Sequence, residues 1–412
     1  MRTVEAQQQL LAEHAVVPEP VRMGITEALG LLSAEEVTAT AAVPGFAQAA
    51  VDGYAVRSVD VGGIRAIGSH PEPVPDRLPV VGHVPAGSQQ PLRLQQGQAV
   101  RIHTGAPLPS LADAVLPLGW SDQGEEFVRA TQPVRPGDFV RQAGDDIQPG
   151  DIALPLHTVI SPAHIALLAA CGRNKVLVHP KPRVSILTVG KQFVDLDRTP
   201  GAGQTFDTVS YALAAAAEDA GAEVHRVGIV QGEPARLRDI IDTQLLRSEI
   251  LLIAGAVGGA DADEFRELLG DVDTTRVAMH PGSVQGFGLV GDSQTPCIVM
   301  DSNPISALVI FEVMVRPLIR AGLGRQATRR RTVVARSVRE VPSTRGRRGF
   351  IRARLMRDTE TGDYLVEGLS AATGAPSHLL AGLAEANAYM IIPEDVERVR
   401  PGDEVDVIFM GA

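Results

Sequence analysis

Three loops in the second half of the chain have residue types that suit ligand binding. They lie at Gly190, at Gly255–Ala260 and at Asp301–Pro304. Glycine-rich loops can bring backbone N–H groups close to an anionic ligand, and these groups then compensate its negative charge. The chemistry to expect at these loops is therefore the binding of a small charged molecule.

The positions of these loops follow from the strands and helices predicted between Lys181 and Gly324. Short apolar runs predict strands at Val184–Val189, Glu223–Val230 and Ile250–Ala254. Capping residues and helical spacing predict helices from Asp207 to Gly221 and at Pro234–Arg247, Asp263–Leu269 and Ser306–Leu323. This alternation indicates a parallel sheet covered by helices, with ligands bound beyond the carboxyl ends of the strands. The three loops should therefore lie together.

The remaining sequence indicates three further domains. The first segment has a helical pattern near Val4 and again at Thr26–Glu36, and another helix should begin at Ser161 and end at Gly172. Residues 46–142 and the stretch after residue 331 have short apolar runs punctuated by Pro and Gly, which is typical of β structure. The predicted fold class is α/β multidomain. It is an elongated four-domain chain with a helical domain split between residues 1–45 and 143–180, an inserted small β module at 46–142, a parallel-sheet α/β domain at 181–327 and a C-terminal β-barrel domain at 328–412.

Composition excludes several classes of protein. The net charge of −11 over 412 residues argues against nucleic-acid binding. The longest apolar run, Ser306–Val315, contains Glu312 and is too short to span a bilayer, and the N-terminus lacks a secretory signal, so we expect a cytoplasmic protein. Cys171 and Cys297 lie in apolar surroundings, which favours buried free thiols and no metal site.

The segment Arg325–Arg357 is strongly basic. It holds twelve arginines and a single acid, Glu340. One interpretation is a solvated basic face, and the other is a docking surface for an acidic partner.

Several short motifs follow one another along the chain. They are Asp52-Gly53-Tyr54-Ala55, Arg101 to Pro109 followed by Ala112-Asp113-Ala114-Val115, Gly144-Asp145-Asp146-Ile147, Gly203 to Thr208, and Asn303-Pro304-Ile305-Ser306-Ala307. In order and spacing these motifs resemble those of the molybdopterin molybdenumtransferases, a family that includes the bacterial MoeA enzymes and the E-domain of gephyrin.

The resemblance implies an elongated homodimer that transfers molybdate onto the dithiolene of adenylylated molybdopterin and releases AMP. It implies an active site between the α/β domain of one subunit and the β module of the other, with Mg²⁺ held by carboxylates. Two family acids and a hydroxyl match Asp52, Asp263 and Thr104.

Other family positions depart from the pattern. The family's two carboxylates after the first strand are Lys191 and Gln192 here, and its two loop lysines are His280 and Ser283. The glycine-rich loop keeps Gly255 and Gly258 but lacks both family hydroxyls, and Asp301 adds an acid. Each lost charge-assisted contact costs about 1.5–3 kcal/mol. We therefore interpret these loops as a degenerate binding site, with no cofactor expected.

The resulting hypothesis is a gephyrin-like, non-catalytic dimeric scaffold. It would bind a short acidic–apolar peptide, such as the tail of the cell-division protein FtsZ or a segment of a membrane receptor, at Pro393 and Val399. The alternatives are an active molybdenumtransferase, using molybdopterin, molybdate and Mg²⁺, and a carrier that binds pterin without transferring metal. For His103 and His280, a loop or packed histidine is favoured over a ligand role.

Overall fold

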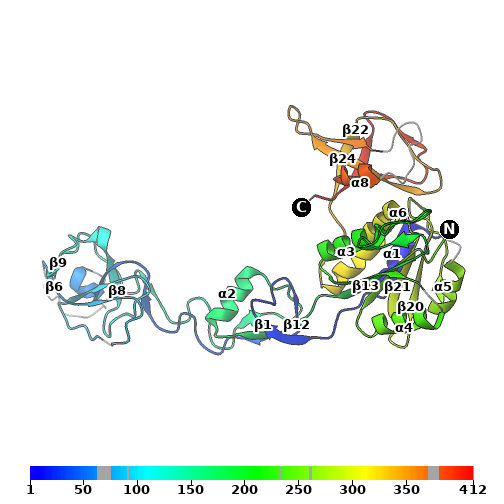
Figure 1. Cartoon of the computed structure of the whole chain (residues 1–412). Coiled ribbons are helices and arrows are strands. Elements are labelled where there is room, and N and C mark those ends of the chain that lie inside the picture. Colours follow the sequence, from blue (N-terminus) through cyan, green and yellow to red (C-terminus); the bar gives the residue numbers. More distant parts are fainter. Residues whose placement is uncertain (63–75, 91, 232–233, 259–261, 370–379, 412) are drawn as a thin grey trace. The chain divides into compact units, whose positions relative to one another are not determined.

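The computed structural model describes residues 1–62, 76–90, 92–231, 234–258, 262–369 and 380–411 (Figure 1). The chain divides into two compact units. Unit 1 comprises Met1–Val21, Gly30–Leu32 and Leu177–Ala412, and unit 2 comprises Arg22–Leu29 and Ser33–Val176. Unit 2 therefore interrupts unit 1 in the sequence.

A six-stranded sheet is the centre of the α/β part of unit 1. Its strand order is β16 (Glu223–Val230), β13 (Arg183–Val189), β17 (Ile250–Ala254), β21 (Thr295–Met300), β20 (Gln285–Val290) and β18 (Val272–Asp273). The first four strands are parallel, and β20 and β18 are added through antiparallel pairs. The parallel sheet, and the bounds predicted for β16 and β17, are confirmed.

Helices cover both faces of this sheet, because its apolar side chains alternate between the faces. Ile186 and Leu252 point into one core, and Leu187 and Ile253 into the other. The first core is covered by α1 (Val4–Ala12), α3 (Val209–Ala220), α6 (Pro304–Ile310), the π-helical segment η3 (Phe311–Val315) and α7 (Arg316–Gly322). The second is covered by α4 (Pro234–Leu245) and α5 (Ala262–Leu269).

The C-terminal part of unit 1 is a closed five-stranded barrel, as predicted. Its strands in order are β24 (Arg348–Arg357), β25 (Tyr364–Gly368), β22 (Thr332–Ser337), β28 (Glu404–Phe409) and β26 (Ala388–Ile392), and a β24–β26 pair closes it. Short elements beside it are β19 (Met279–His280), which pairs with β24, β23 (Val341–Pro342), β27 (Arg398–Val399) and α8 (Leu380–Ala384).

Unit 2 contains the β module. Its five-stranded sheet has the order β8 (Ala114–Pro117), β5 (Gly53–Val56), β7 (Ala99–Ile102), β6 (Leu78–Val84) and β9 (Phe127–Val128). Helix α2 (Pro162–Ala170) begins at a capping box made by Ser161 and His164, close to its predicted bounds. The short strands pair as β4 (Gln48–Ala49) with β10 (Val140–Arg141) and β3 (Val37–Thr38) with β11 (Ile152–Leu154).

The helix predicted at Thr26–Glu36 is wrong. Residues 25–30 form turns that end at Gly30, whose φ is +80°, and Leu32–Ser33 form strand β2. Strand β2 joins β1 (Val21–Gly24) and β12 (Lys175–His179) in a three-stranded sheet, so tertiary pairing overrides local helix propensity here. The split segment is therefore less helical than expected, and its proposed domain boundaries stay a prediction.

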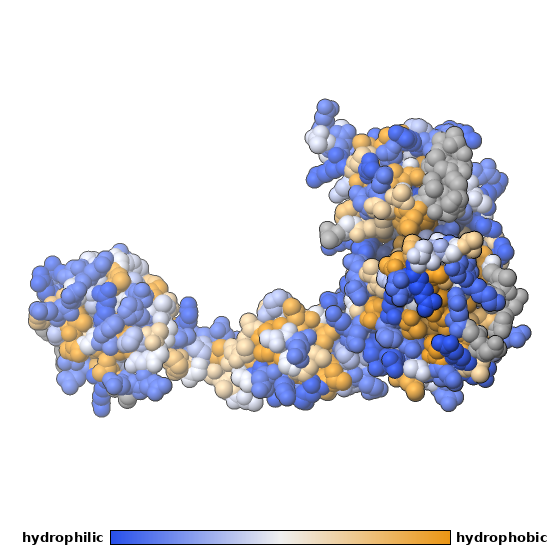
Figure 2. All heavy atoms as spheres, viewed as in Figure 1, coloured by the Kyte–Doolittle hydropathy of each residue, from blue (hydrophilic) through white to orange (hydrophobic). Residues whose placement is uncertain are grey.

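Half of the arginines in the basic segment form salt bridges with described acidic residues. Salt bridges join six of its arginines to acidic side chains of unit 1; the arginines are Arg330, Arg336, Arg339, Arg345, Arg348 and Arg354. This favours a solvated, charge-paired face, and hydrophilic residues cover much of the visible surface (Figure 2). Among the described residues, no helix is long and apolar enough to cross a membrane.

Candidate active site

The three predicted ligand loops do lie together, at the carboxyl ends of adjacent strands. Ala254, the last residue of β17, pairs with Thr188 of β13 on one side and with Met300 of β21 on the other. The loops that begin at Gly190, Gly255 and Asp301 therefore leave the sheet side by side. We call this place the sheet edge.

Gly255 lets these loops approach closely. Its φ is +88°, and a Cβ built there would lie 2.1 Å from the carbonyl oxygen of Val189. Its N–H donates to the carbonyl oxygen of Met300 over 2.8 Å. The N–H groups of the next three residues, Ala256 to Gly258, donate to no described residue.

Asp301 is half-buried at this edge. Burial raises the pKa of its carboxyl, although the N–H of Asn303 donates to it over 3.1 Å. Asn303 in turn caps α6, because its Oδ1 accepts from the N–H of Ile305 over 2.9 Å. Asp301 thus belongs to the sheet edge, where its carboxylate also holds its own loop.

The hydroxyl of Ser283 is used within the protein, and His280 lies in a short strand beside the barrel. The hydroxyl of Ser283 is buried and donates to the carbonyl oxygen of Val277 over 2.8 Å. His280 pairs in register with Gly349 of the barrel strand β24. Burial, with a contribution from the Arg347 guanidinium, lowers the pKa of His280, so its imidazole is neutral at pH 7. Ser283 is therefore a packed loop residue, and His280 is a partly buried strand residue.

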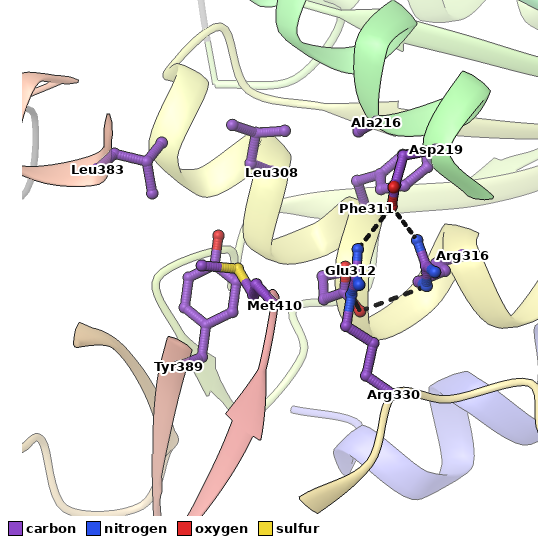
Figure 3. Close-up of a pocket in the computed structure, with 10 residues that line it drawn as sticks. All are labelled: Ala216, Asp219, Leu308, Phe311, Glu312, Arg316, Arg330, Leu383, Tyr389 and Met410. Carbon is purple, nitrogen blue, oxygen red and sulfur yellow. Dashed lines mark hydrogen bonds and ion pairs between the residues drawn. The ribbon is translucent and has the colours of Figure 1, made fainter. Parts of the chain in front are cut away.

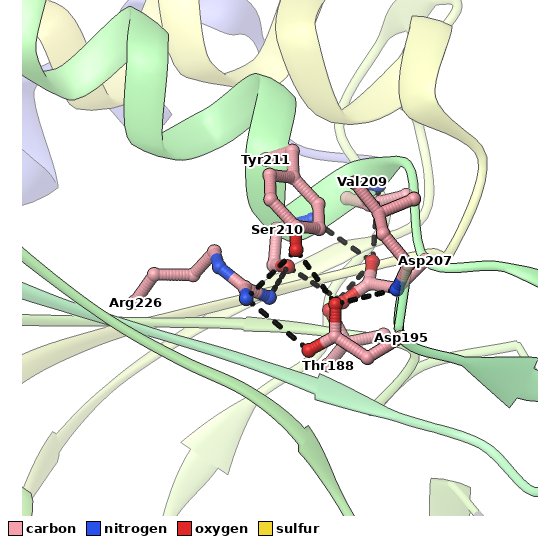
Figure 4. A network of polar contacts seen from close by, with 8 residues as sticks. Thr188, Asp195, Asp207, Val209, Ser210, Tyr211 and Arg226 are labelled. Carbon is pink, nitrogen blue, oxygen red and sulfur yellow. Dashed lines mark hydrogen bonds and ion pairs between the residues drawn. The ribbon is translucent and has the colours of Figure 1, made fainter. Parts of the chain in front are cut away.

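A buried network supports the loop that leads from β13 to α3 (Figure 4). The carboxylate of Asp207 is inaccessible to solvent and accepts from the hydroxyl of Thr188 over 3.2 Å and from that of Ser210 over 2.5 Å. It also accepts from the backbone N–H groups of Val209 and Ser210. The helix begins one residue later than predicted, with Thr208 as its N-cap, but the Asp207 carboxylate accepts from its first N–H groups and ties α3 to β13.

Three further residues extend this network, and no pattern in the sequence points to them. The hydroxyl of Tyr211 donates to Asp195 over 2.6 Å, and the guanidinium of Arg226 donates to Asp195 over 3.2 Å. That guanidinium also lies 3.9 Å from the centre of the Tyr211 ring, so Arg226 joins its own strand to α3 and to the loop that carries Asp195. The hydrogen bond from Tyr211 lowers the pKa of Asp195. Asp195 lies between the short paired strands β14 (Phe193–Val194) and β15 (Thr205–Phe206), which follow Lys191 in the connection from β13 to α3. The contacts of Asp195 therefore help to hold this connection in place.

In unit 2 the structure brings Asp52 and Thr104 together. The N–H of Thr104 donates to Oδ1 of Asp52 over 2.8 Å, and Nδ1 of His103 lies 3.4 Å from the same oxygen. The Thr104 N–H is the main reason that the pKa of Asp52 is lowered. Asp52 is half-exposed and ionised, so it can act on a ligand. Asp263 lies on α5, but its side chain falls outside the described residues.

The two predicted peptide-binding residues differ in their exposure to solvent. Pro393 follows β26 and is exposed. Val399 is 2% exposed and belongs to the hydrophobic core of the barrel, so its side chain is not available to a peptide.

The donor set at the sheet edge does not fit a carboxylate-held Mg²⁺. Lys191 and Gln192 follow Gly190, where the family resemblance implies carboxylates. Among the residues whose side chains are described, no group of three His, Cys, Asp or Glu residues is placed to hold a metal ion. We therefore assign no step to such an ion.

Protein-family models match three successive parts of the chain. Residues 2–172 match the model of the MoeA N-terminal region, residues 185–321 that of a probable molybdopterin binding domain, and residues 334–410 that of the MoeA C-terminal region. The chain therefore belongs to the MoeA family.

Curated relatives and solved structures agree. Molybdopterin molybdenumtransferase 1 of Mycobacterium tuberculosis is 52% identical over 100% of this chain and 99% of its own length. Molybdopterin molybdenumtransferase 2 of the same species is 34% identical over 99% of both chains. A molybdopterin biosynthesis MoeA protein from Pyrococcus horikosii has a TM-score of 0.79 and 29% identity, covering 100% of this chain and 99% of that one.

These relatives overturn the hypothesis of a non-catalytic scaffold. A protein that is 52% identical along the whole length is named as an enzyme, and nothing supports the roles in peptide binding, cell division or FtsZ binding. The hypothesis weighed lost side chains such as those at His280 and Ser283. It gave too little weight to the glycine-rich backbone after Gly255, which remains at the sheet edge. The expectation of no cofactor is likewise unsupported, because residues 185–321 match a molybdopterin-binding model.

Proposed function

We propose that this chain is an active molybdopterin molybdenumtransferase. It would transfer molybdate onto the dithiolene of adenylylated molybdopterin, with release of AMP. The observation that carries this proposal is the 52% identity, over the full length, to a relative named for that activity. The grouping of three ligand loops at one sheet edge supports it.

The described residues suggest how the substrates are held. Both substrates are anionic, so the backbone N–H groups of Ala256 to Gly258 and the ammonium of Lys191 would compensate their charge. The Asp207 network would keep the adjoining loop in place, so that little reorganisation is needed on binding. Asp52 would remain ionised beside Thr104 and would position or deprotonate a reacting group.

We also propose that the chain functions as a homodimer, because the family resemblance implies an active site shared by two subunits. Light scattering at micromolar concentration should give the mass of a dimer. Inactive variants with lesions in different units should regain activity when mixed subunits exchange. A stable monomer with full activity would contradict the proposal.

A reconstituted assay tests the activity. The purified chain is given adenylylated molybdopterin and molybdate, and AMP release and activation of a cofactor-free molybdoenzyme are followed. Asp52→Asn should lower turnover at least about tenfold, because it removes the charge at the reacting centre. The matched control is Asp122→Asn, since Asp122 is another exposed acid of the β module that accepts a backbone N–H, here from Arg129. No AMP release by the unmodified chain, with an active relative as positive control, would refute the proposal.

A further inference from the structure

A cavity of about 260 Å³ lies in unit 1 where the barrel meets the α/β part (Figure 3). It lies at the C-terminal end of α3, whereas the Asp207 network lies at the N-terminal end. Most of its wall is apolar, and this wall consists of Ala216, Leu308, Phe311, Leu383 and Met410.

The opposite wall carries four charged side chains. Arg330 donates to Glu312 over 3.1 Å and to Asp219 over 2.6 Å, and Arg316 donates to Asp219 over 2.8 Å. The side chains of Arg316, Arg330 and Glu312 are 10–17% exposed, but that of Asp219 is 59% exposed. A guanidinium has five N–H donors, so both arginines keep donors beyond those used in these pairs.

Tyr389 adds a hydroxyl without a partner. The residue is only 3% exposed, yet its hydroxyl makes no hydrogen bond to the described part of the chain. Figure 3 shows this hydroxyl pointing into the cavity beside Leu308 and Met410. A tyrosine hydroxyl that lines a cavity and has no protein partner can donate a hydrogen bond to an occupant of that cavity.

We propose that this cavity binds a small carboxylate whose apolar body is about the size of one aromatic ring. The unused polar groups are N–H and O–H donors, so the matching ligand group is an acceptor, and a carboxylate fits a guanidinium in geometry and charge. A dry cavity of about 150 Å³ accommodates benzene, so this volume holds one ring and its substituent. Met410 and Phe311 offer sulfur and aromatic contacts to such a ring.

The ligand carboxylate would compete with the Asp219 carboxylate for the guanidinium of Arg330. Its carboxylate bridges Arg316 and Arg330 from the rim of the cavity, and its exposure allows it to turn into solvent. A bound carboxylate would then take its place on Arg330 while Glu312 stays paired. The site is independent of the proposed transferase chemistry, because it shares no residue with the sheet edge.

Phenylacetate is a suitable probe, and phenylacetamide is its uncharged counterpart. Ligand-observed NMR and calorimetry on the full chain should show phenylacetate binding at least about tenfold more tightly than phenylacetamide, since the charge doubles the strength of each hydrogen bond. Tyr389→Phe should weaken phenylacetate binding roughly tenfold. Tyr364→Phe, at an exposed tyrosine of the same barrel, should leave it unchanged. Asp219→Asn should strengthen it, because the competing charge is gone.

Some results would overturn the proposal. These are no binding of phenylacetate at millimolar concentration, equal binding of phenylacetate and phenylacetamide, or weaker binding by a folded Asp219→Asn variant. They would indicate a cavity filled by water or a purely apolar pocket. If Tyr389→Phe fails to fold, Leu308→Phe fills the cavity from the opposite wall and should abolish binding. Retained binding by that variant would place the probe elsewhere.

Discussion

His280 couples the stability of unit 1 to pH. Burial lowers its pKa below the ordinary value of 6.5, so the unfolded chain binds a proton more readily than the folded one. Stability is therefore fully present above about pH 6.5 and falls as the pH drops below it.

We predict that urea unfolding will show a loss of stability between pH 7.5 and pH 5.5 that is smaller in His280→Gln. The amide of glutamine does not titrate in this range, so that part of the pH dependence disappears. An identical pH dependence in both proteins would show that His280 is protonated without cost in the folded state.

Val399 and Pro393 differ in burial, and their substitutions should differ accordingly. Val399→Ala should lower the free energy of unfolding by about 2 kcal/mol, because it leaves a cavity in the barrel core. Pro393→Ala should change it by less than about 0.5 kcal/mol, because Pro393 is exposed. Chemical denaturation measures both. A large cost at Pro393 alone would mean that the proline sets the path of the chain.

The residues of the candidate site were predictable to different degrees. Gly255 and Asp301 follow apolar runs, so the rule for parallel sheets placed them at one edge from sequence alone. Asp52 and Thr104 came only from resemblance, since they lie 52 positions apart and meet through strand pairing. Arg226 could not be found, because a strand arginine reveals its partners only in three dimensions.

At the scale of elements, Gly255 fixes the spacing of β13, β17 and their loops. Gly255→Ala should lower the stability of unit 1 by at least about 2 kcal/mol more than Gly402→Ala. Both residues have φ near +90°, but a Cβ at Gly402 would meet nothing within 4 Å, so the control isolates the clash with Val189. Gly255→Ala should also reduce turnover. Equal costs for the two variants would mean that the loops yield without strain.

The elements themselves were predicted where pattern and tertiary context agree. Glu223–Val230 and Ile250–Ala254 were placed correctly, because a run of apolar residues bounded by turns suits a buried strand. Thr26–Glu36 failed, because its residues have reasonable helix propensity but Gly24 and Gly30 bound a turn and Leu32 enters a sheet. A single sequence does not show whether a helix or pairing in a sheet is the more favourable structure for such a segment.

At the scale of the whole molecule, each unit has cores of its own, so we predict two calorimetric transitions. Ser161→Ala removes a helix cap in unit 2, costs about 1 kcal/mol and should lower one transition by about 2–4 °C. Gly255→Ala should lower the other. A single transition shifted by both substitutions would show that the units unfold cooperatively.

The closed barrel has a consequence for hydrogen exchange and for aggregation. In the described part of the barrel each of the five strands has a neighbour on both sides, although β22 pairs with β25 only at Arg336 and Ser337, so little free strand edge is left for another chain. Gly349–Ala353 of β24 pair with β26 and Ala353–Arg357 pair with β25, so the amide protons bonded in these ladders should exchange slowly until the barrel opens. The open sheet differs, because β16 and β18 end it on either side. When the protein is warmed, intermolecular strand addition should begin at those two strands, while the barrel amides are still protected.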